Sequence, residues 1–130
     1  MPTVLVIEDD HETRVSLREL LEGEGYTVLT ATNGFEGYSV LQRTQQFPLV
    51  VLLDQNLPIA NGDEFLELKA GNKRLEKVPV IVISAVPDRL GLEPGVVKFF
   101  RKPIRIPELL RVIREQFPAT MWALDTPQAI

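Results

Sequence analysis

Acidic, hydroxyl and ammonium side chains come just after four short apolar runs of this sequence. They are Glu8, Asp9 and Asp10, then Asp54, Ser84 and Lys102. Clustered carboxylates repel one another and resist ionisation unless a cation neutralises them. A hard divalent ion satisfies such a cluster, and Mg²⁺ is the usual choice beside phosphate. Lys102, as a point charge, and Ser84, as a hydrogen-bond donor, suit the remaining oxygens of a phosphoryl group.

These side chains can act together only if the apolar runs end at one edge of a sheet. Each run is too short for a helix and mostly lacks polar alternation, which is typical of strands buried on both faces. The predicted strands are Val4–Ile7, Leu49–Leu53, Val78–Ile83 and Val96–Phe100, with Thr27–Ala31 as a weaker candidate nearer an edge. In an open α/β sheet, ligands bind beyond the carboxyl ends of the strands. The polar side chains are therefore expected to converge there.

Segments with helical periodicity lie between these runs. The apolar positions that recur are Leu17, Leu20 and Leu21; Phe35, Tyr38 and Leu41; Phe65 and Leu68; and Ile106, Leu110, Ile113 and Phe117. Strands and helices thus alternate, except for an irregular stretch before the last strand. Such alternation predicts a doubly wound α/β fold with a parallel sheet and right-handed crossovers. Pro107 suits the first turn of the last helix, where its missing N–H costs nothing.

Composition excludes several classes of protein. The 130 residues are about one domain's worth, and 45% hydrophobic with 25% charged residues argue against disorder. The net charge of −4 gives no broad footprint for nucleic acid or an anionic membrane. Without cysteine and with a single histidine, the chain cannot build disulfides, thiolate zinc sites or multi-histidine metal sites.

The chain is expected to form one cytoplasmic domain. No apolar run approaches the ~18 residues that a membrane span needs. Periodicity fades after Phe117, so we predict a domain at residues 1–117 and a C-terminal tail or the start of a linker at 118–130. The expected partners are proteins or small anions, with no direct contact to nucleic acid or membrane.

Four stretches resemble the receiver domain of two-component response regulators, including the stand-alone chemotaxis type. The stretches are Val4–Asp10, Leu53–Pro58 with Asn61 and Gly62 behind it, Pro79–Ala85, and Phe99–Pro103. The resemblance covers residues 3–117. It implies a flavodoxin-like sheet of five parallel strands in the order 2-1-3-4-5, of which the chemotaxis member is a known example. It also implies a phosphorylation-dependent switch of a phosphorelay, one that catalyses only its own phosphorylation and dephosphorylation.

The resemblance assigns a role to each acidic position. Asp54 matches the phosphoacceptor, which takes a phosphoryl group from a sensor histidine kinase or a histidine phosphotransfer protein. Asp54 and Asp9 match direct ligands of a Mg²⁺ cofactor, Glu8 a ligand through water, and Asn56 a ligand through its backbone carbonyl. Carboxylate nucleophiles are known for phosphoryl transfer, which needs mainly positioning and charge neutralisation.

The other matched positions concern the response to phosphorylation. Ser84 matches the hydroxyl that bonds the phosphoryl group, Lys102 the lysine that pairs with it, and Phe99 the switch aromatic. In the family, the hydroxyl moves inward and the aromatic side chain fills the vacated space, which shifts a two-state surface. The implied partners of that surface are a downstream effector protein or a second copy of the chain. The family also holds the bond that matches Lys102–Pro103 in the cis form.

The chain departs from the family between Ser84 and Lys102. This interval is about one helical turn, or ~4 residues, shorter than usual. It contains residues that are poor in a helix interior, namely Pro87, Gly91, Pro94 and Gly95. We predict that the fourth helix, between Val86 and Pro94, is truncated, distorted or absent. The output surface is then altered, whereas the phosphorylation pocket is not.

Other interpretations of the same residues stay open. A degenerate receiver would keep the fold as a phosphorylation-independent protein-binding module. A phosphohydrolase with an aspartyl nucleophile typically needs a second acid two residues later, where this chain has Asn56. Asp10 is expected to cap the first helix in preference to binding metal, because Asp is favoured there. Phe99 is expected to fill the core whether or not it also switches.

Overall fold

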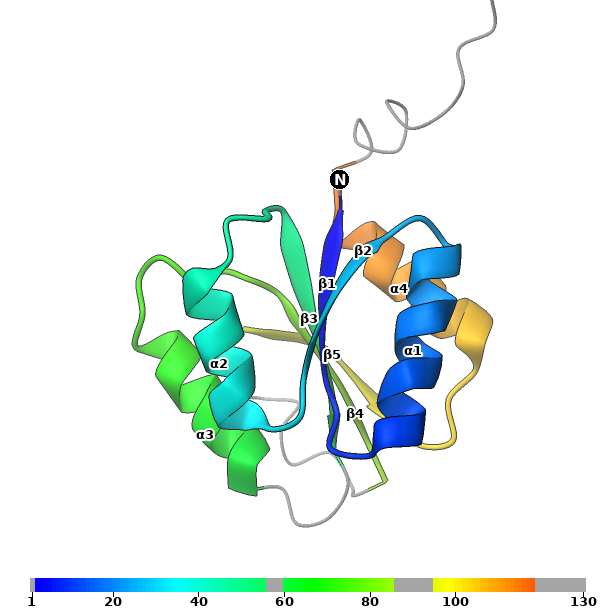
Figure 1. Ribbon diagram of the computed structural model, residues 1–130, viewed down its shortest axis with the longest axis horizontal. Helices are drawn as coiled ribbons and strands as arrows, with labels where there is room; N and C mark the ends of the chain where they lie inside the picture. The colour runs from blue at the N-terminus through cyan, green and yellow to red at the C-terminus, as the bar shows by residue number, and fades with distance from the viewer. Residues whose placement is uncertain (1, 56–59, 86–94, 119–130) are drawn as a thin grey trace, which may run out of the picture.

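The computed structural model describes residues 2–55, 60–85 and 95–118 of the chain. Within these ranges, five parallel strands form one sheet in the order β2-β1-β3-β4-β5 (Figure 1). The strands are β1 (Thr3–Ile7), β2 (Thr27–Ala31), β3 (Leu49–Gln55), β4 (Val80–Ser84) and β5 (Val96–Arg101). The predicted doubly wound parallel sheet and its 2-1-3-4-5 order are confirmed.

Helices cover both faces of the sheet in the described part of the chain. One face carries α1 (His11–Gly23) and α4 (Ile106–Glu115), and the other carries α2 (Gly34–Arg43) and α3 (Ala60–Ala70) (Figure 1). Because crossovers between parallel strands are right-handed, the connection from β1 toward β2 and those toward β3 and β4, which run the opposite way across the sheet, pass over opposite faces. All polar strand ends then meet on the same edge of the sheet.

Two cores lie on either side of the central strands. Leu5 and Val51 pack on the α2–α3 side, whereas their chain neighbours Val4 and Val50 pack on the α1–α4 side. All four residues are fully buried. Burial of successive residues on opposite faces explains why these runs show no polar alternation.

Asp10 caps α1, as predicted. Its Oδ2 accepts hydrogen bonds from the backbone N and the Oγ1 of Thr13, at 2.9 and 2.7 Å. The bond to the backbone satisfies a donor that the first turn of a helix leaves without a partner. Pro107 lies in the first turn of α4, also as predicted. The cap at Asp10 fixes the length of the loop that carries Glu8 and Asp9.

The inward faces of three helices differ from the prediction. Phe35 is 56% exposed, Leu68 39% and Ile106 40%, although the periodicity predicts that each faces the core. In α2, Gly37 lies so close to β1 that an added Cβ would overlap a strand side chain. In α3, the residue after Leu68 is Lys69, which is buried instead. Large apolar residues therefore give the period of a helix, but small and charged residues can share its buried face.

Strand boundaries also differ from the prediction, among other places at the start of β4 and at the ends of β3 and β5. β4 begins at Val80, two residues after the predicted start at Val78. Val78 N donates to Leu75 O and closes a turn after α3, so the first two residues of the predicted strand lie before β4. β3 and β5 run further than predicted, to Gln55 and Arg101. The extension of β3 places Asp54 inside the strand, one residue before its end.

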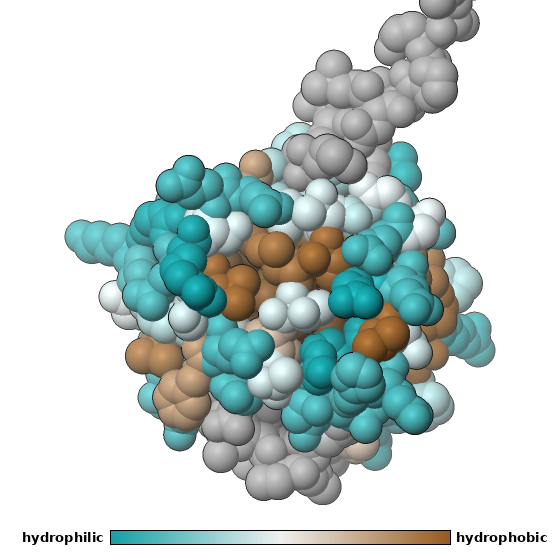
Figure 2. All heavy atoms as spheres, in the orientation of Figure 1, coloured by the Kyte–Doolittle hydropathy of each residue, from teal (hydrophilic) through white to brown (hydrophobic). Residues whose placement is uncertain are grey.

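The two edge strands are less buried than the three central ones. Residues 27–30 of β2 are half-buried, which confirms the predicted edge position of this strand. Figure 2 shows hydrophobic side chains reaching the surface between the two helical layers, where β2 runs. β5, at the other edge, contains a bulge opposite Val80 and Ile81, and Val97 there is 50% exposed.

Two predictions concern parts of the chain outside the described residues. The segment between Val86 and Pro94, where we predict a truncated, distorted or absent helix between β4 and β5 that is distinct from α4, falls in the undescribed range 86–94. Most of the predicted tail at 118–130 does so as well. Both stay predictions.

Lys69 is a buried cation that joins α3 to the loops before β4 and β5. Its side chain is 1% exposed, and its Nζ donates a hydrogen bond to Glu76 O at 2.9 Å. Burial lowers the pKa of Lys69. The backbone at Gly95 has a φ of +86°, and a Cβ at this position would lie 2.7 Å from Nζ. Both the backbone and the lysine beside it therefore favour glycine at 95.

We predict that Gly95→Ala destabilises the domain more than Gly25→Ala. Both glycines have positive φ, +86° and +94°, so alanine costs about 1–2 kcal/mol of backbone strain at either position. A Cβ at Gly25 meets no atom within 4 Å, whereas at Gly95 it must displace Lys69. Urea denaturation of both variants gives the difference in free energy of unfolding. Equal losses would show that Lys69 moves aside without cost.

Candidate functional site

Asp54 is a buried carboxylate that forms an ion pair with the partly exposed Lys102 at the carboxyl edge of the sheet. It is 7% exposed, and Lys102 Nζ lies 2.8 Å from its Oδ1. Lys102 follows β5, and its backbone N donates to Ser84 O at 2.9 Å, which continues the ladder beyond the strand. The bond between Lys102 and Pro103 is cis, as the resemblance implies. The structure thus joins two predicted site residues from strands that β4 separates.

Glu8 is a second buried carboxyl group at this edge. It is 1% exposed, and its Oε1 accepts a hydrogen bond from Asp10 N at 2.9 Å. Burial raises the pKa of Glu8 to about 8; the Asp10 N–H opposes this shift, and the carboxyl groups of Asp54 and Asp9 reinforce it. Glu8 therefore does not ionise readily at neutral pH without a further positive charge.

The donor set at this edge fits a hard divalent cation. The crowded carboxyl groups of Glu8 and Asp54 need positive charge, and Asp9, beside them, is exposed. Within the ranges that the structure describes, no group of three or more His, Cys, Asp or Glu side chains is placed to hold a metal by itself. Mg²⁺ usually uses one or two carboxylates and keeps several waters, so it fits such a site. Asn56, the predicted carbonyl ligand, lies outside the described residues.

Ser84 and Phe99 lie on neighbouring strands beside the acidic residues. Ser84 ends β4, is 1% exposed and pairs in register with Gln55, the residue after Asp54. Phe99 pairs with Val82 and packs, half-buried, against the core on the α2–α3 side. Since alternate residues of a strand share a face, Ser84 and Phe99 lie on that same side of the sheet. The core position predicted for Phe99 is confirmed.

Arg14 contacts the acidic loop, although no motif of the sequence marks it. Its Nη1 donates to Glu8 O at 2.9 Å and to Asp9 O at 3.4 Å, and its Nη2 lies 3.1 Å from His11 Nδ1. The only sequence signal is its place, one turn into the helix that follows the acidic residues. Helical side chains lean toward the amino end, so an arginine there can reach back over the loop.

A cavity of about 460 Å³ opens beside the ion pair. Asp54 and Lys102 line it together with Thr13, Leu17, Ile83, Pro103, Ile104 and Ile106. All of these companions except Thr13 are apolar, and Ile106 is 40% exposed. The acidic pocket therefore has an apolar rim formed by α1 and the segment between β5 and α4. A few polar groups within an apolar wall are typical of binding sites.

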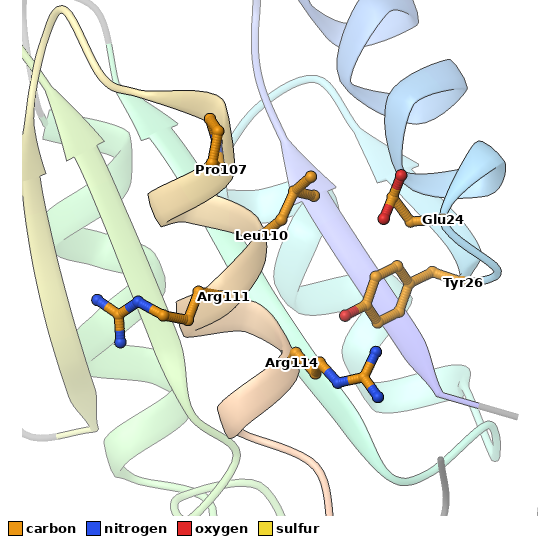
Figure 3. Close-up of a pocket in the computed structure, with 6 residues that line it drawn as sticks. All are labelled: Glu24, Tyr26, Pro107, Leu110, Arg111 and Arg114. Atoms are coloured by element: carbon orange, nitrogen blue, oxygen red, sulfur yellow. The ribbon is translucent and has the colours of Figure 1, made fainter. Parts of the chain in front are cut away.

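A second cavity, of about 240 Å³, lies between the end of α1 and α4 (Figure 3). Its lining residues are Glu24, Tyr26, Pro107, Leu110, Arg111 and Arg114. Figure 3 shows the Tyr26 ring extending from the segment after α1 toward α4, above the Arg114 guanidinium. Burial raises the pKa of Tyr26 to about 12. None of the residues predicted to handle a phosphoryl group lines this cavity, so it is separate from the candidate site.

Comparison with known proteins assigns the family. The sequence profile described as the response regulator receiver domain matches residues 4–114. The chain belongs to the response regulator receiver family. This receiver is 36% identical over 118 residues to a CpxR homolog, a transcriptional regulatory protein of Haemophilus influenzae. The match covers 88% of this chain and 49% of that protein.

Solved receivers have the same fold. The chemotaxis response regulator CheY4 of Vibrio cholerae superposes with a TM-score of 0.77 at 23% identity, covering 90% of this chain and 99% of CheY4. The receiver domain of the sensor histidine kinase PA1611 of Pseudomonas aeruginosa PAO1 gives 0.74 at 21%, covering 87% of this chain and 94% of that domain. That receiver was crystallised with a magnesium ion in its active site cleft.

The family assignment makes this domain a signalling module of two-component systems, not a conventional enzyme. The chain spans about half or less of the length of the curated relatives it matches. Across the described ranges, none of the helices has the length and apolar character needed to cross a membrane.

We predict that Tyr26 makes the receiver less stable at alkaline pH. The pKa of its phenol is about 12 in the fold against an ordinary value of 10.0, so the unfolded chain releases this proton first as pH rises. Its stabilising contribution is therefore complete below the ordinary pKa and is lost as pH rises toward the folded value. In Tyr26→Phe, the free energy of unfolding should fall less steeply above about pH 9. Urea titrations across this range test it, and parallel curves for both proteins would contradict it.

Proposed function

We propose that this receiver is a phosphorylation-dependent switch whose phosphoacceptor is Asp54. The proposed donor is a phosphohistidine of a sensor histidine kinase or of a histidine phosphotransfer protein, and the proposed cofactor is Mg²⁺. The observation that carries the proposal is the ion pair of the buried Asp54 carboxylate with Lys102, at 2.8 Å, beside the buried carboxyl group of Glu8. A carboxylate held against a fixed cation is suited to receive a phosphoryl group.

The proposed step needs no reactant besides the phosphohistidine and water. A carboxylate oxygen of Asp54 attacks the phosphorus of the phosphohistidine, so an O–P bond forms while the N–P bond breaks. The leaving imidazole keeps the electron pair of the broken bond and takes up a proton from water. Lys102 Nζ, 2.8 Å from Asp54 Oδ1, faces the charge that spreads over the phosphoryl oxygens. The product is an acyl phosphate, which water can hydrolyse.

The proposed ligands of Mg²⁺ are Asp9, Asp54 and the backbone carbonyl of Asn56, with Glu8 acting through water. When bound, the ion supplies the positive charge that crowded carboxyl groups and phosphoryl oxygens both require. Two observations support this cofactor. Glu8 and Asp54 are buried close together with Lys102 as the cation paired to Asp54, and the PA1611 receiver carries magnesium in its cleft.

The proposed response to phosphorylation involves Ser84 and Phe99. Both lie on the α2–α3 side of the sheet, and Ser84 is one register position beyond Asp54. Movement of the Ser84 hydroxyl toward a phosphoryl group would leave room that the half-buried Phe99 ring can enter. The surface so changed is the proposed contact for a downstream effector protein or for a second copy of the receiver.

The rim of the site favours a protein as phosphodonor. Leu17, Ile104 and Ile106 line the cavity beside Asp54, and a small charged donor would gain nothing from this apolar lining. A protein that carries a phosphohistidine on an apolar helix face could cover these apolar side chains when it docks. This arrangement accounts for the 40% exposure of Ile106 at the start of α4.

We predict that acetyl phosphate with Mg²⁺ adds the mass of one phosphoryl group to the receiver. Asp54→Asn should abolish this gain, because the amide cannot form the acyl phosphate. Asp63→Asn, on α3 outside the site, is the matched control and should keep it. Intact-protein mass spectrometry measures all three proteins. No gain in the parent chain would favour a degenerate receiver that binds partners without phosphorylation.

We predict that Lys102→Met slows phosphorylation of Asp54. The substitution keeps the length of the side chain but removes the cation facing the phosphoryl oxygens, which is typically worth about 10²-fold or more in rate. Lys98→Met, on the exposed part of β5, is the control with the same loss of charge and should leave the rate near that of the parent. Rates with acetyl phosphate at saturating Mg²⁺ decide the matter. Equal rates for both variants would reject the role of Lys102.

A further inference from the structure

Arg14 is the side chain that fastens the loop between β1 and α1. It is half-buried and lies in the first turns of α1. One guanidinium nitrogen donates to Glu8 O at 2.9 Å and to Asp9 O at 3.4 Å, and the other lies 3.1 Å from His11 Nδ1. A single planar group thus contacts two consecutive residues of the loop and the first residue of α1, which no flexible ammonium group could do with the same geometry.

The same loop is held at its other points by bonds that do not involve Arg14. Glu8 N donates to Ala31 O at 3.0 Å, and the Asp10 side chain caps α1 through Thr13. The carbonyl groups of Glu8 and Asp9 accept from Arg14. These two carbonyls adjoin the side chains that the proposed site needs, so their orientation sets where both carboxyl groups point.

We propose that Arg14 is a positioning residue that orients the carboxyl groups of Glu8 and Asp9 for Mg²⁺. The inference rests on the proposed function, since it concerns the same metal site. Arg14 acts through the loop backbone. Partners of metal-site residues that fix their orientation typically contribute about 10–100-fold to metal affinity.

Because Arg14 is positively charged, a purely electrostatic role and a positioning role predict opposite changes in Mg²⁺ affinity when it is removed. A guanidinium near a cation site repels the cation, so by Coulomb's law alone its removal strengthens Mg²⁺ binding. If orientation of the loop dominates, removal weakens binding instead. Arg18, one turn further along α1, offers a matched charge: its side chain is 46% exposed and lies 3.9 Å from Glu22, away from the acidic loop.

The experiment compares Mg²⁺ affinity of the parent receiver, Arg14→Ala, Arg14→Lys and Arg18→Ala by calorimetric titration. Circular dichroism first confirms that each variant is folded at the temperature used. We expect Arg14→Ala to bind Mg²⁺ about 10-fold more weakly or worse. Arg14→Lys keeps the charge but lacks the planar guanidinium group with its several N–H donors, so it should bind Mg²⁺ several-fold more weakly than the parent. Arg18→Ala should bind as the parent does or slightly more tightly.

A second measurement separates positioning from general damage. In acetyl phosphate reactions, Arg14→Ala should need more Mg²⁺ for half-maximal rate yet approach the parent rate at saturation. Arg14→Ala binding as tightly as the parent, or more tightly, overturns the inference while leaving the proposed function intact. If Arg14→Ala does not fold, Arg14→Lys decides by the same criterion. Absence of Mg²⁺ binding by the parent receiver would instead overturn the proposed function itself.

Discussion

The burial of the Asp54 carboxylate against the partly exposed ammonium group of Lys102 is the constraint on which the site depends. A carboxylate that is 7% exposed has lost most of its hydration, and only a cation held in place can compensate it. The parallel sheet meets this need because all its strands end on one edge. An exposed pair such as Arg18 and Glu22, 3.9 Å apart, imposes no such demand, because water replaces either partner.

The pocket is electrostatically unbalanced toward negative charge. Glu8 and Asp54 are both buried, Asp9 adjoins them, and Lys102 is the cation paired with Asp54. A phosphoryl group on an aspartate would carry ≈ −1.5 to −2 of charge if it resembles other phosphorylated side chains, in place of the single negative charge of the carboxylate. A site that is already crowded with carboxyl groups cannot absorb that addition passively. Rearrangement of nearby donors is the physical response, which is how a local charge becomes a change of surface.

Much of this architecture could be predicted from the sequence, because each line of evidence has a direct physical cause. Continuous apolar runs mark strands buried on both faces, and polar residues after them mark the carboxyl edge, so Asp54 and Lys102 were recognisable as neighbours. Contacts that depend on how far a side chain reaches could not be predicted from the sequence. Arg14 has no motif, and Lys69 occupies a buried position of α3 that apolar periodicity cannot detect. The cis bond between Phe47 and Pro48 likewise left no signal in the residues around it.

The bulge in β5 has a consequence for how the molecule meets its neighbours. An edge strand exposes a row of unpaired amide and carbonyl groups, on which a strand from another chain can nucleate. The extra residue at Val97 interrupts the regular spacing of that row, and the exposed Lys98 beside it adds a charge. Both features discourage indiscriminate addition of a foreign strand to this edge of the sheet.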